Sequence, residues 1–153
     1  MVAILNPFDP RPVLFARHAQ HVVLVHFPIA LCLVSIAFDF IAHWTKKRLL
    51  EEVAYYNLLV AAISTVPVVA TGLLAWRWQL EGQRLKGTLL LHLVLGCLAS
   101  GLIWLVWSLH CRRHRNPGSE LPLYRLPIEL ATAAVVALTA HLGGFLSGVN
   151  SPG

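Results

Sequence analysis

The sequence predicts an all-α membrane protein, built as an up-down bundle of four transmembrane helices. Of its 153 residues, 57% are hydrophobic and only 12% are charged, whereas a soluble domain carries roughly 25% charged residues. Four runs reach the roughly 20 mostly apolar residues that a helix needs to cross a bilayer. They cover residues 21–43, 53–76, 88–109 and 127–148. We therefore expect a single membrane domain over residues 1–153.

The first two runs carry signals at their ends. We expect helices in both, because backbone groups in lipid must be satisfied within the segment. In the first run, Pro28 leaves the carbonyl of Leu24 without its usual amide partner, which predicts a kink or a helix start there. The second run ends near Trp76 and Trp78, whose amphipathic rings favour the membrane interface. Residues 1–20 are expected to lie along the membrane surface.

The third run leads into a basic stretch, and the fourth opens near Glu129, where a carboxylate suits the helix dipole. Short connections make consecutive helices antiparallel neighbours, which predicts the up-down order. No internal repeat is apparent in the sequence. The three cysteines, Cys32, Cys97 and Cys111, show no pairing pattern and are interpreted as small packing residues.

The net charge of +5 is concentrated at the predicted helix ends. Seven lysines and arginines fall in the first and third connections, and five fall on the opposite side. The positive-inside rule therefore places the first and third connections in the cytoplasm and both termini outside. Basic helix ends fit anionic lipid headgroups, and this use of the charge argues against a nucleic-acid partner.

Three histidines, His26, His92 and His141, each fall in a different apolar run. An ionisable side chain within a membrane is costly, which makes each of them a functional hypothesis. Counted from the outer helix ends, all three lie about 8–10 Å deep at a rise of about 1.5 Å per residue. His21 lies nearer the interface as a fourth candidate, but it is about 140° around the helix from His26. A regular helix cannot point both residues at one centre.

Three interpretations of these histidines are open. Two imidazoles from facing helices can ligate a haem iron, with His141 as the first candidate and His92 or His26 opposite. Neutral imidazole also suits copper or zinc, with the same three residues as metal ligands. Alternatively, each histidine hydrogen-bonds a neighbouring helix in a cofactor-free subunit. Small residues on the histidine faces, Gly96 and Gly144 among them, fit either a slot for a macrocycle or close helix packing.

The remaining polar residues are interpreted as structural. Asp39 and His43 lie one turn apart, which predicts an interfacial ion pair between them or with Lys46. His110 and His114 have the spacing of metal ligands but lie among arginines, so a solvated basic helix end is expected. No nucleophile–base pair or carboxylate pair is apparent inside the spans, which argues against an enzyme acting on a small substrate.

The segment HVVLVHFPIAL at residues 21–31 resembles the opening of a bacterial membrane-protein family of unknown function. That family has an HPxLVHFPIAL-type first helix with an acidic residue near its end, here Asp39, and an HxGG-type last helix, here residues 141–144. Val22 stands where the family usually has proline, and Ser147 stands where some relatives have a second histidine. Members are sometimes fused to c-type cytochrome or Rieske domains, so the resemblance implies a redox setting.

Together these patterns favour a multi-pass protein of a bacterial cytoplasmic membrane that binds b-type haem near the outer face and serves electron transfer. Its expected partners are the bilayer and a redox protein or larger membrane complex. Both termini are expected in the periplasm. The open alternatives are a cofactor-free accessory subunit of a larger redox or photosynthetic complex, and a copper- or zinc-binding membrane protein.

Overall fold

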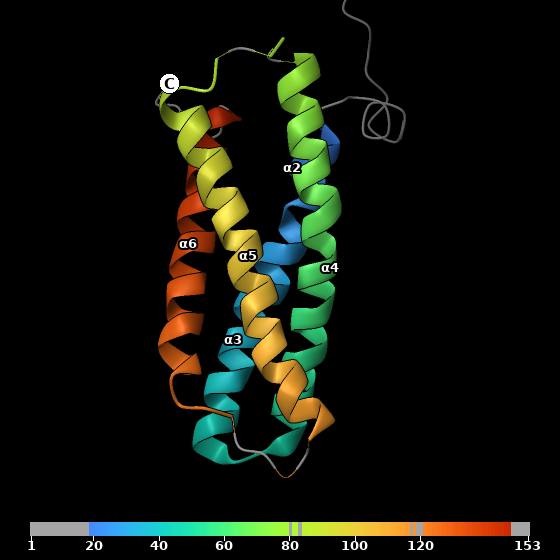
Figure 1. The fold of residues 1–153 in the computed structure, drawn as a ribbon, viewed down its shortest axis with the longest axis vertical. Helices are drawn as coiled ribbons and strands as arrows, with labels where there is room; N and C mark the ends of the chain where they lie inside the picture. The colour runs from blue at the N-terminus through green and yellow to red at the C-terminus, as the bar shows by residue number, and fades with distance from the viewer. Residues whose placement is uncertain (1–18, 80, 83, 117, 119–120, 148–153) are drawn as a thin grey trace, which may run out of the picture.

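In the computed structural model, the described part of the chain is helical and contains no strand (Figure 1). The structure describes residues 19–79, 81–82, 84–116, 118 and 121–147. The helices are α2 (Ala19–Leu24), α3 (His26–Thr45), α4 (Arg48–Gln79), α5 (Gly87–Arg115) and α6 (Arg125–Leu146). The predicted interfacial segment at residues 1–20 falls almost entirely outside the described residues.

Four helical stretches are long and apolar enough to cross a membrane, which confirms the predicted fold class. They are Gln20–Thr45, Arg48–Trp78, Gly87–Arg115 and Arg125–Leu146. The second and third are longer than the apolar runs that predicted them, because α4 starts at Arg48 and α5 continues to Arg115. These extra turns carry basic and acidic side chains, so the helices extend past the apolar layer at one end of the bundle.

The first span is divided at Val25, as Pro28 predicts. Proline has no N–H to offer the carbonyl of Leu24, so the regular ladder is interrupted one turn before it. One helical hydrogen bond is kept at the break, since the Val25 N–H donates to the His21 carbonyl at 3.0 Å. At its far end α3 stops at Lys46, whose φ of 58° turns the chain toward α4.

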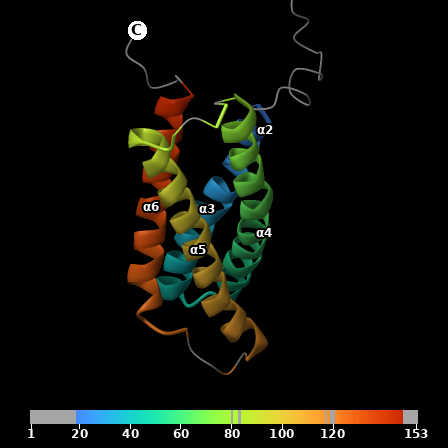
Figure 2. The same ribbon diagram turned by 45° about the horizontal axis from the view of Figure 1, so that its top comes forward.

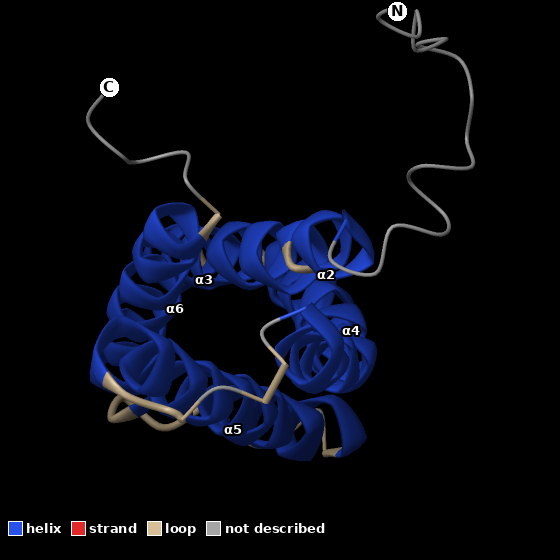
Figure 3. Cartoon of the chain, turned by 90° about the horizontal axis from the view of Figure 1, so that it is seen from above, coloured by secondary structure: helices blue, strands red, loops and turns tan. Residues whose placement is uncertain are grey.

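The helices run alternately up and down around one axis. Figures 1 and 2 show the α3–α4 and α5–α6 connections at one end of the bundle and the α4–α5 connection at the other. Seen from above in Figure 3, α3 and α5 occupy one diagonal and α4 and α6 the other. We call the end with α2 and the α4–α5 connection the histidine end, and the opposite end the ionic end.

The apolar core in the middle of the bundle is built largely from small side chains. It joins residues of all four spans, namely Cys32, Ile36, Ala61, Ala62, Ala99, Ile103 and Val136. In lipid the apolar solvent offers no hydrophobic drive for association, so helices associate through close van der Waals packing. Small residues allow that approach, which is why alanine dominates this layer.

The two halves of the bundle repeat one set of contacts 71 residues apart. The His21 ring bonds the Val68 carbonyl, and the His92 ring bonds the Thr139 carbonyl, each pair being 47 residues apart in sequence. Adding 71 to His21 gives His92, and adding 71 to Val68 gives Thr139. The α2–α3–α4 hairpin and the α5–α6 hairpin therefore hold their histidines in the same way.

Buried positions follow the same offset. Four buried residues of α3 and four of α4 have buried counterparts in α5 and α6: Pro28 and Ala99, Cys32 and Ile103, Ser35 and Val106, Asp39 and His110, Ala54 and Arg125, Leu58 and Glu129, Ala61 and Thr132, Thr65 and Val136. A two-helix hairpin returns the chain to the side on which it began, so the second hairpin has the same orientation as the first. The hairpins are quasi-equivalent in these contacts and buried positions, a structural correspondence that the sequence, in which no internal repeat is apparent, did not predict.

Candidate functional site

The histidine end carries two imidazoles in equivalent positions. His21 Nδ1 lies 3.1 Å from the Val68 carbonyl oxygen and 3.3 Å from Thr71 Oγ1. His92 Nδ1 lies 3.1 Å from the Thr139 carbonyl oxygen. A carbonyl can only accept, so each Nδ1–H donates, and each neutral ring keeps its lone pair on Nε2. No bond to either Nε2 is found among the described residues.

A glycine lies against each of these rings. A Cβ added at Gly72 would come within 3.0 Å of His21 Cε1, and one added at Gly143 would come within 3.2 Å of His92 Cε1. Both distances are tighter than ordinary van der Waals contact. The absence of a side chain at these two positions is therefore what allows the imidazoles to lie close to α4 and α6.

The two rings also lie at the same end of the bundle. His21 comes from α2 and His92 from the start of α5, on one diagonal of the bundle. They are near enough for an electrostatic interaction between them. Both side chains are half-buried, so the pair lies where the interior of the bundle meets the histidine end.

The structure brings only one of the three predicted ligands into this pair. His92 is half-buried and bonded to α6, whereas His26 is exposed and its Nδ1–H donates to the Val22 carbonyl, one helical turn earlier, at 2.7 Å. His141 is also exposed, and its ring meets the edge of Phe145 at a centroid distance of 4.9 Å. The convergence of His26, His92 and His141 stays a prediction, while the observed arrangement favours His21 as the partner of His92.

Of the two predicted glycines, Gly96 does not lie against either ring. A Cβ at Gly96 would meet only the Thr139 side chain, at an ordinary 3.8 Å, so Gly96 serves the α5–α6 contact. On α6, the residue against the His92 ring is Gly143, which comes one position before the predicted Gly144.

The ionic end holds four buried ionisable side chains that the sequence did not single out as a group. Arg125 Nε donates to Asp39 Oδ2 at 2.8 Å, and His110 Nε2 lies 2.9 Å from Glu129 Oε1. Side-chain atoms of Asp39, His110 and Glu129 all lie within 4.8 Å of one another. We call Asp39, His110, Arg125 and Glu129 the ionic cluster.

This cluster is closely packed but incompletely hydrogen-bonded. Asp39 and Glu129 are each 0% exposed, and Asp39 Oδ1 and Glu129 Oε2 have no hydrogen-bond partner in the described structure. Arg125 is better satisfied, because its Nη1 also reaches the carbonyls of Leu121 and Pro122 at 3.4 and 3.5 Å. Buried polar groups without partners are uncommon and each calls for an explanation.

Four sequence-based expectations for these residues were wrong. Asp39 pairs with Arg125 and not with His43 or Lys46. Glu129 is buried against His110 instead of serving only the helix dipole. His110 is 2% exposed and so is not part of a solvated end.

The fourth wrong expectation was that the spans contain no carboxylate pair, because Asp39 and Glu129 form one. His114, which the spacing had paired with His110, does lie at the helix end, where its ring stacks on Tyr55 at a centroid distance of 4.2 Å. A signal for the cluster was present in the spacing. His110 lies 18 residues after His92, as Asp39 does after His21, and 18 residues make five helical turns.

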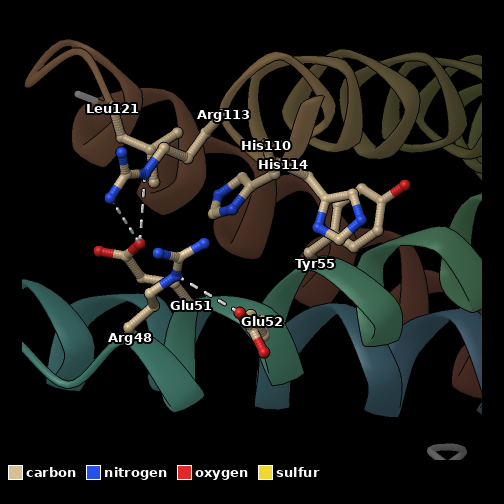
Figure 4. A pocket seen from close by; sticks show the side chains of 8 residues that line it. All are labelled: Arg48, Glu51, Glu52, Tyr55, His110, Arg113, His114 and Leu121. Carbon is tan, nitrogen blue, oxygen red and sulfur yellow. Dashed lines mark hydrogen bonds and ion pairs between the residues drawn. The ribbon is translucent and has the colours of Figure 1, made fainter. Parts of the chain in front are cut away.

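A pocket opens beside the cluster at the same end (Figure 4). Its walls come from α4, from α5 and from the connection before α6, and the residues are Arg48, Glu51, Glu52, Tyr55, His110, Arg113, His114 and Leu121. His110 is the member of the ionic cluster that lines this pocket. Its ring therefore stands between the polar pocket and buried Glu129.

These features define a four-helix membrane protein with two polar sites on one axis, a histidine pair at one end and an ionic cluster at the other. The chain belongs to the family described as "Predicted membrane protein (DUF2231)", whose model matches residues 17–150. No curated protein and no solved structure matches the chain.

Proposed function

We propose that this protein is a membrane electron-transfer protein that holds a b-type haem between His21 and His92. The observation that carries the proposal is the equivalence of the two imidazoles. Each is presented by a corresponding position of a repeated hairpin, with Nδ1 bonded to a carbonyl and Nε2 left for a ligand. Haem sites in helical bundles use two such imidazoles from facing helices.

The hydrogen bonds to Val68 and Thr139 support a ligand role in a second way. A metal-bound histidine nearly always donates its other ring N–H to a carbonyl or carboxylate, which fixes the tautomer and the ring orientation. A neutral structural histidine has no such need to present its second nitrogen. In this chain both carbonyl acceptors belong to a neighbouring span, so the orientation of each ring is set by the packing of the bundle.

The glycines against the rings support the same site. Gly72 and Gly143 allow the His21 and His92 rings to lie against α4 and α6, a position from which a single methyl group would displace them. When bound, the haem iron supplies reversible one-electron redox chemistry. In this proposal the protein ligates the iron through the two Nε2 atoms and fixes both rings through Nδ1. Its apolar helices surround the site and limit the access of water.

The orientation and partners follow from charge and family resemblance. The basic residues of the α3–α4 and α5–α6 connections favour the cytoplasmic side for the ionic end. The histidine end then faces the periplasm of a bacterial cytoplasmic membrane, together with both termini. A haem there would exchange electrons with a periplasmic redox protein or with a larger membrane complex that this chain joins.

The test is an absorption spectrum of the purified full-length protein, first oxidised and then reduced. A Soret band of stoichiometric intensity that shifts on reduction is expected. His21→Ala and His92→Ala should each abolish it, whereas His26→Ala and His141→Ala, which alter exposed imidazoles, should leave it intact.

Three outcomes would contradict the proposal. Loss of the band in His26→Ala or His141→Ala alone would return the ligands to the residues expected from sequence. Stoichiometric copper or zinc by elemental analysis, without a Soret band, would mark a metal-binding protein. A colourless, metal-free protein that co-purifies with a redox complex would mark an accessory subunit.

A further inference from the structure

The ionic cluster has an unbalanced set of charges. Asp39 and Glu129 bring two negative charges, and Arg125 brings one positive charge that no protein environment removes. With His110 neutral and Glu129 ionised, the buried group carries a net negative charge. One proton added to the His110–Glu129 pair makes the cluster neutral, and burial favours the neutral state.

The unpartnered oxygens Asp39 Oδ1 and Glu129 Oε2 agree with a proton held on one of the two carboxyl groups, because a buried oxygen without a hydrogen bond costs less on a neutral acid than on an anion. An ionised carboxylate only accepts hydrogen bonds, whereas a protonated one also donates. Asp39 and Glu129 approach one another within 4.8 Å and each keeps one oxygen without a partner in the described structure. Two carboxylates that share a buried site do not both ionise readily, because like charges repel at short range.

His110 connects this pair to water. Its Nε2 bonds Glu129 Oε1 at 2.9 Å, and the same ring lines the pocket at the ionic end. In Figure 4 the imidazole is seen among the pocket side chains of α4 and α5. An imidazole can take up a proton at one nitrogen and release one from the other, which makes it a suitable relay.

We propose that the ionic cluster is a proton-binding site, loaded with one exchangeable proton from the pocket through His110 and holding it on Glu129. In the empty state His110 Nε2–H donates to ionised Glu129. A hydronium ion in the pocket gives its proton to His110 Nδ1 and leaves as water. The Nε2 proton then moves to Glu129 Oε1, and the ring returns to neutral with its proton on Nδ1. This site stands independently of any haem.

The neighbours of the site determine how it responds to pH. Asp39 and Arg125 belong to the same cluster as the His110–Glu129 pair. Cys32 on α3 is near enough to Glu129 for an electrostatic interaction. The pocket adds titratable and charged groups from α4 and α5, namely Arg48, Glu51, Glu52, Tyr55, Arg113 and His114. Glu51 is paired with Arg113 across the pocket, from α4 to α5, and Glu52 is paired with Arg48 one turn away on α4. These pairs leave the pocket polar without a large excess of one charge, so a proton can enter against a small electrostatic barrier.

A divalent cation is the competing occupant, and Arg125 argues against it. Its guanidinium already takes Asp39 Oδ2 at 2.8 Å and places a fixed positive charge where a metal ion would lie. Asp39, His110 and Glu129 together would supply three ligand atoms to such an ion. The experiment therefore includes a metal titration.

The experiment is infrared spectroscopy of the full-length protein in lipid nanodiscs, as a function of pH and in H₂O and D₂O. The carbonyl stretch of a protonated carboxylic acid is expected to appear as the pH falls while the helices stay folded, and to shift in D₂O. Incorporation of ¹³C-labelled glutamate should move this band and so assign it to glutamate without any substitution.

Variants then locate the proton. Glu129→Gln should remove the band, whereas Glu52→Gln should keep it, because Glu52 is an exposed glutamate of the same pocket. His110→Gln, which keeps a polar side chain but cannot relay a proton, should slow the exchange of the acid proton for deuterium.

Three results would overturn the proposal. The first is a wild-type protein without a titrating glutamic acid band at any pH at which it is folded. The second is a band that survives in folded Glu129→Gln. The third is stoichiometric binding of Zn²⁺ or Mn²⁺ by calorimetry that folded Asp39→Asn loses. If Glu129→Gln does not fold, the labelled wild-type spectra decide alone.

Discussion

At both ends of the bundle, polar side chains occupy positions related by the 71-residue offset, but the paired residues are alike at one end and different at the other. At the histidine end the repeat is preserved, since His21 and His92 bond equivalent carbonyls and lie against equivalent glycines, although His21 has an additional contact with Thr71 Oγ1. At the ionic end it is broken, since Asp39 faces His110.

The break extends to α6, where Arg125 and Glu129 occupy the positions that hold Ala54 and Leu58 on α4. Equal donors suit a single ligand bound symmetrically on the axis. The unlike side chains of the ionic cluster suit a proton that enters through one residue and is held on another.

The largest effect should come from breaking the buried ion pair of the ionic end. Arg125→Ala leaves Asp39 charged and unpaired in the interior, which should lower the free energy of unfolding by about 3–5 kcal/mol. The measurement is equilibrium unfolding in mixed detergent micelles. Combining Arg125→Met with Asp39→Asn removes both charges and should recover most of the loss. A small loss in Arg125→Ala would mean that water or lipid headgroups already reach this end.

Next in size are the glycine contacts of the histidine end. Gly143→Ala and Gly72→Ala force a methyl group against an imidazole, and overpacking of this kind costs about 1–3 kcal/mol. Gly101→Ala is the matched control, because a Cβ there meets nothing within 4 Å. If the two halves of the repeat are equivalent, Gly72→Ala and Gly143→Ala should lower the free energy of unfolding by similar amounts in the same assay.

A smaller effect is expected from the histidines themselves in the haem-free protein. His21→Ala and His92→Ala each remove the interhelical hydrogen bond to a carbonyl, and His21→Ala also removes the contact with Thr71. Interhelical hydrogen bonds in membrane proteins are worth about 0.6 kcal/mol on average. His26→Ala should cost less, because its bond lies within its own chain turn and is exposed. A smaller loss for His21→Ala than for His92→Ala, despite the additional Thr71 contact of His21, would show that the break at Val25 weakens the first position.

The smallest effect belongs to the exposed pair at the ionic end. Arg48 and Glu52 lie 3.4 Å apart with side chains 63% and 48% exposed. An exposed pair spaced four residues apart on a helix contributes about 0.3–0.5 kcal/mol. Arg48→Ala should therefore change the unfolding free energy far less than Arg125→Ala. The comparison separates the effect of burial from the effect of charge at one end of the molecule.

The spans were predictable because the membrane imposes them. Long apolar runs, interfacial tryptophans and Pro28 defined four helices and the break in the first. Helix ends were harder to place, since α4 and α5 continue into charged turns that hydropathy does not detect. Helix geometry also gave the angle between His21 and His26, and so the prediction that a regular helix cannot point both of them at one centre.

The prediction favoured His26 because of its depth in the membrane, whereas the observed hydrogen bonds favour His21. Depth was used as the criterion, and depth does not tell an inward face from an outward one. The ionic cluster was missed because each member has a plausible local partner or role near a helix end. Its true partners are distant, with Asp39 and Arg125 separated by 86 residues. The faint shared pattern of His21-x-Val23-Leu24 and His92-x-Val94-Leu95 was the remaining signal of the repeat.

The replacement of Ala54 and Leu58 by Arg125 and Glu129 has a consequence for how the halves depend on each other. Two copies of the first hairpin would place two aspartates at the axis with no arginine to neutralise them. Two copies of the second would bury two arginines and two glutamates without Asp39. At the histidine end either hairpin would serve in the place of the other. The two hairpins are thus interchangeable at the histidine end, whereas the ionic end needs one copy of each. This requirement keeps both halves in one chain.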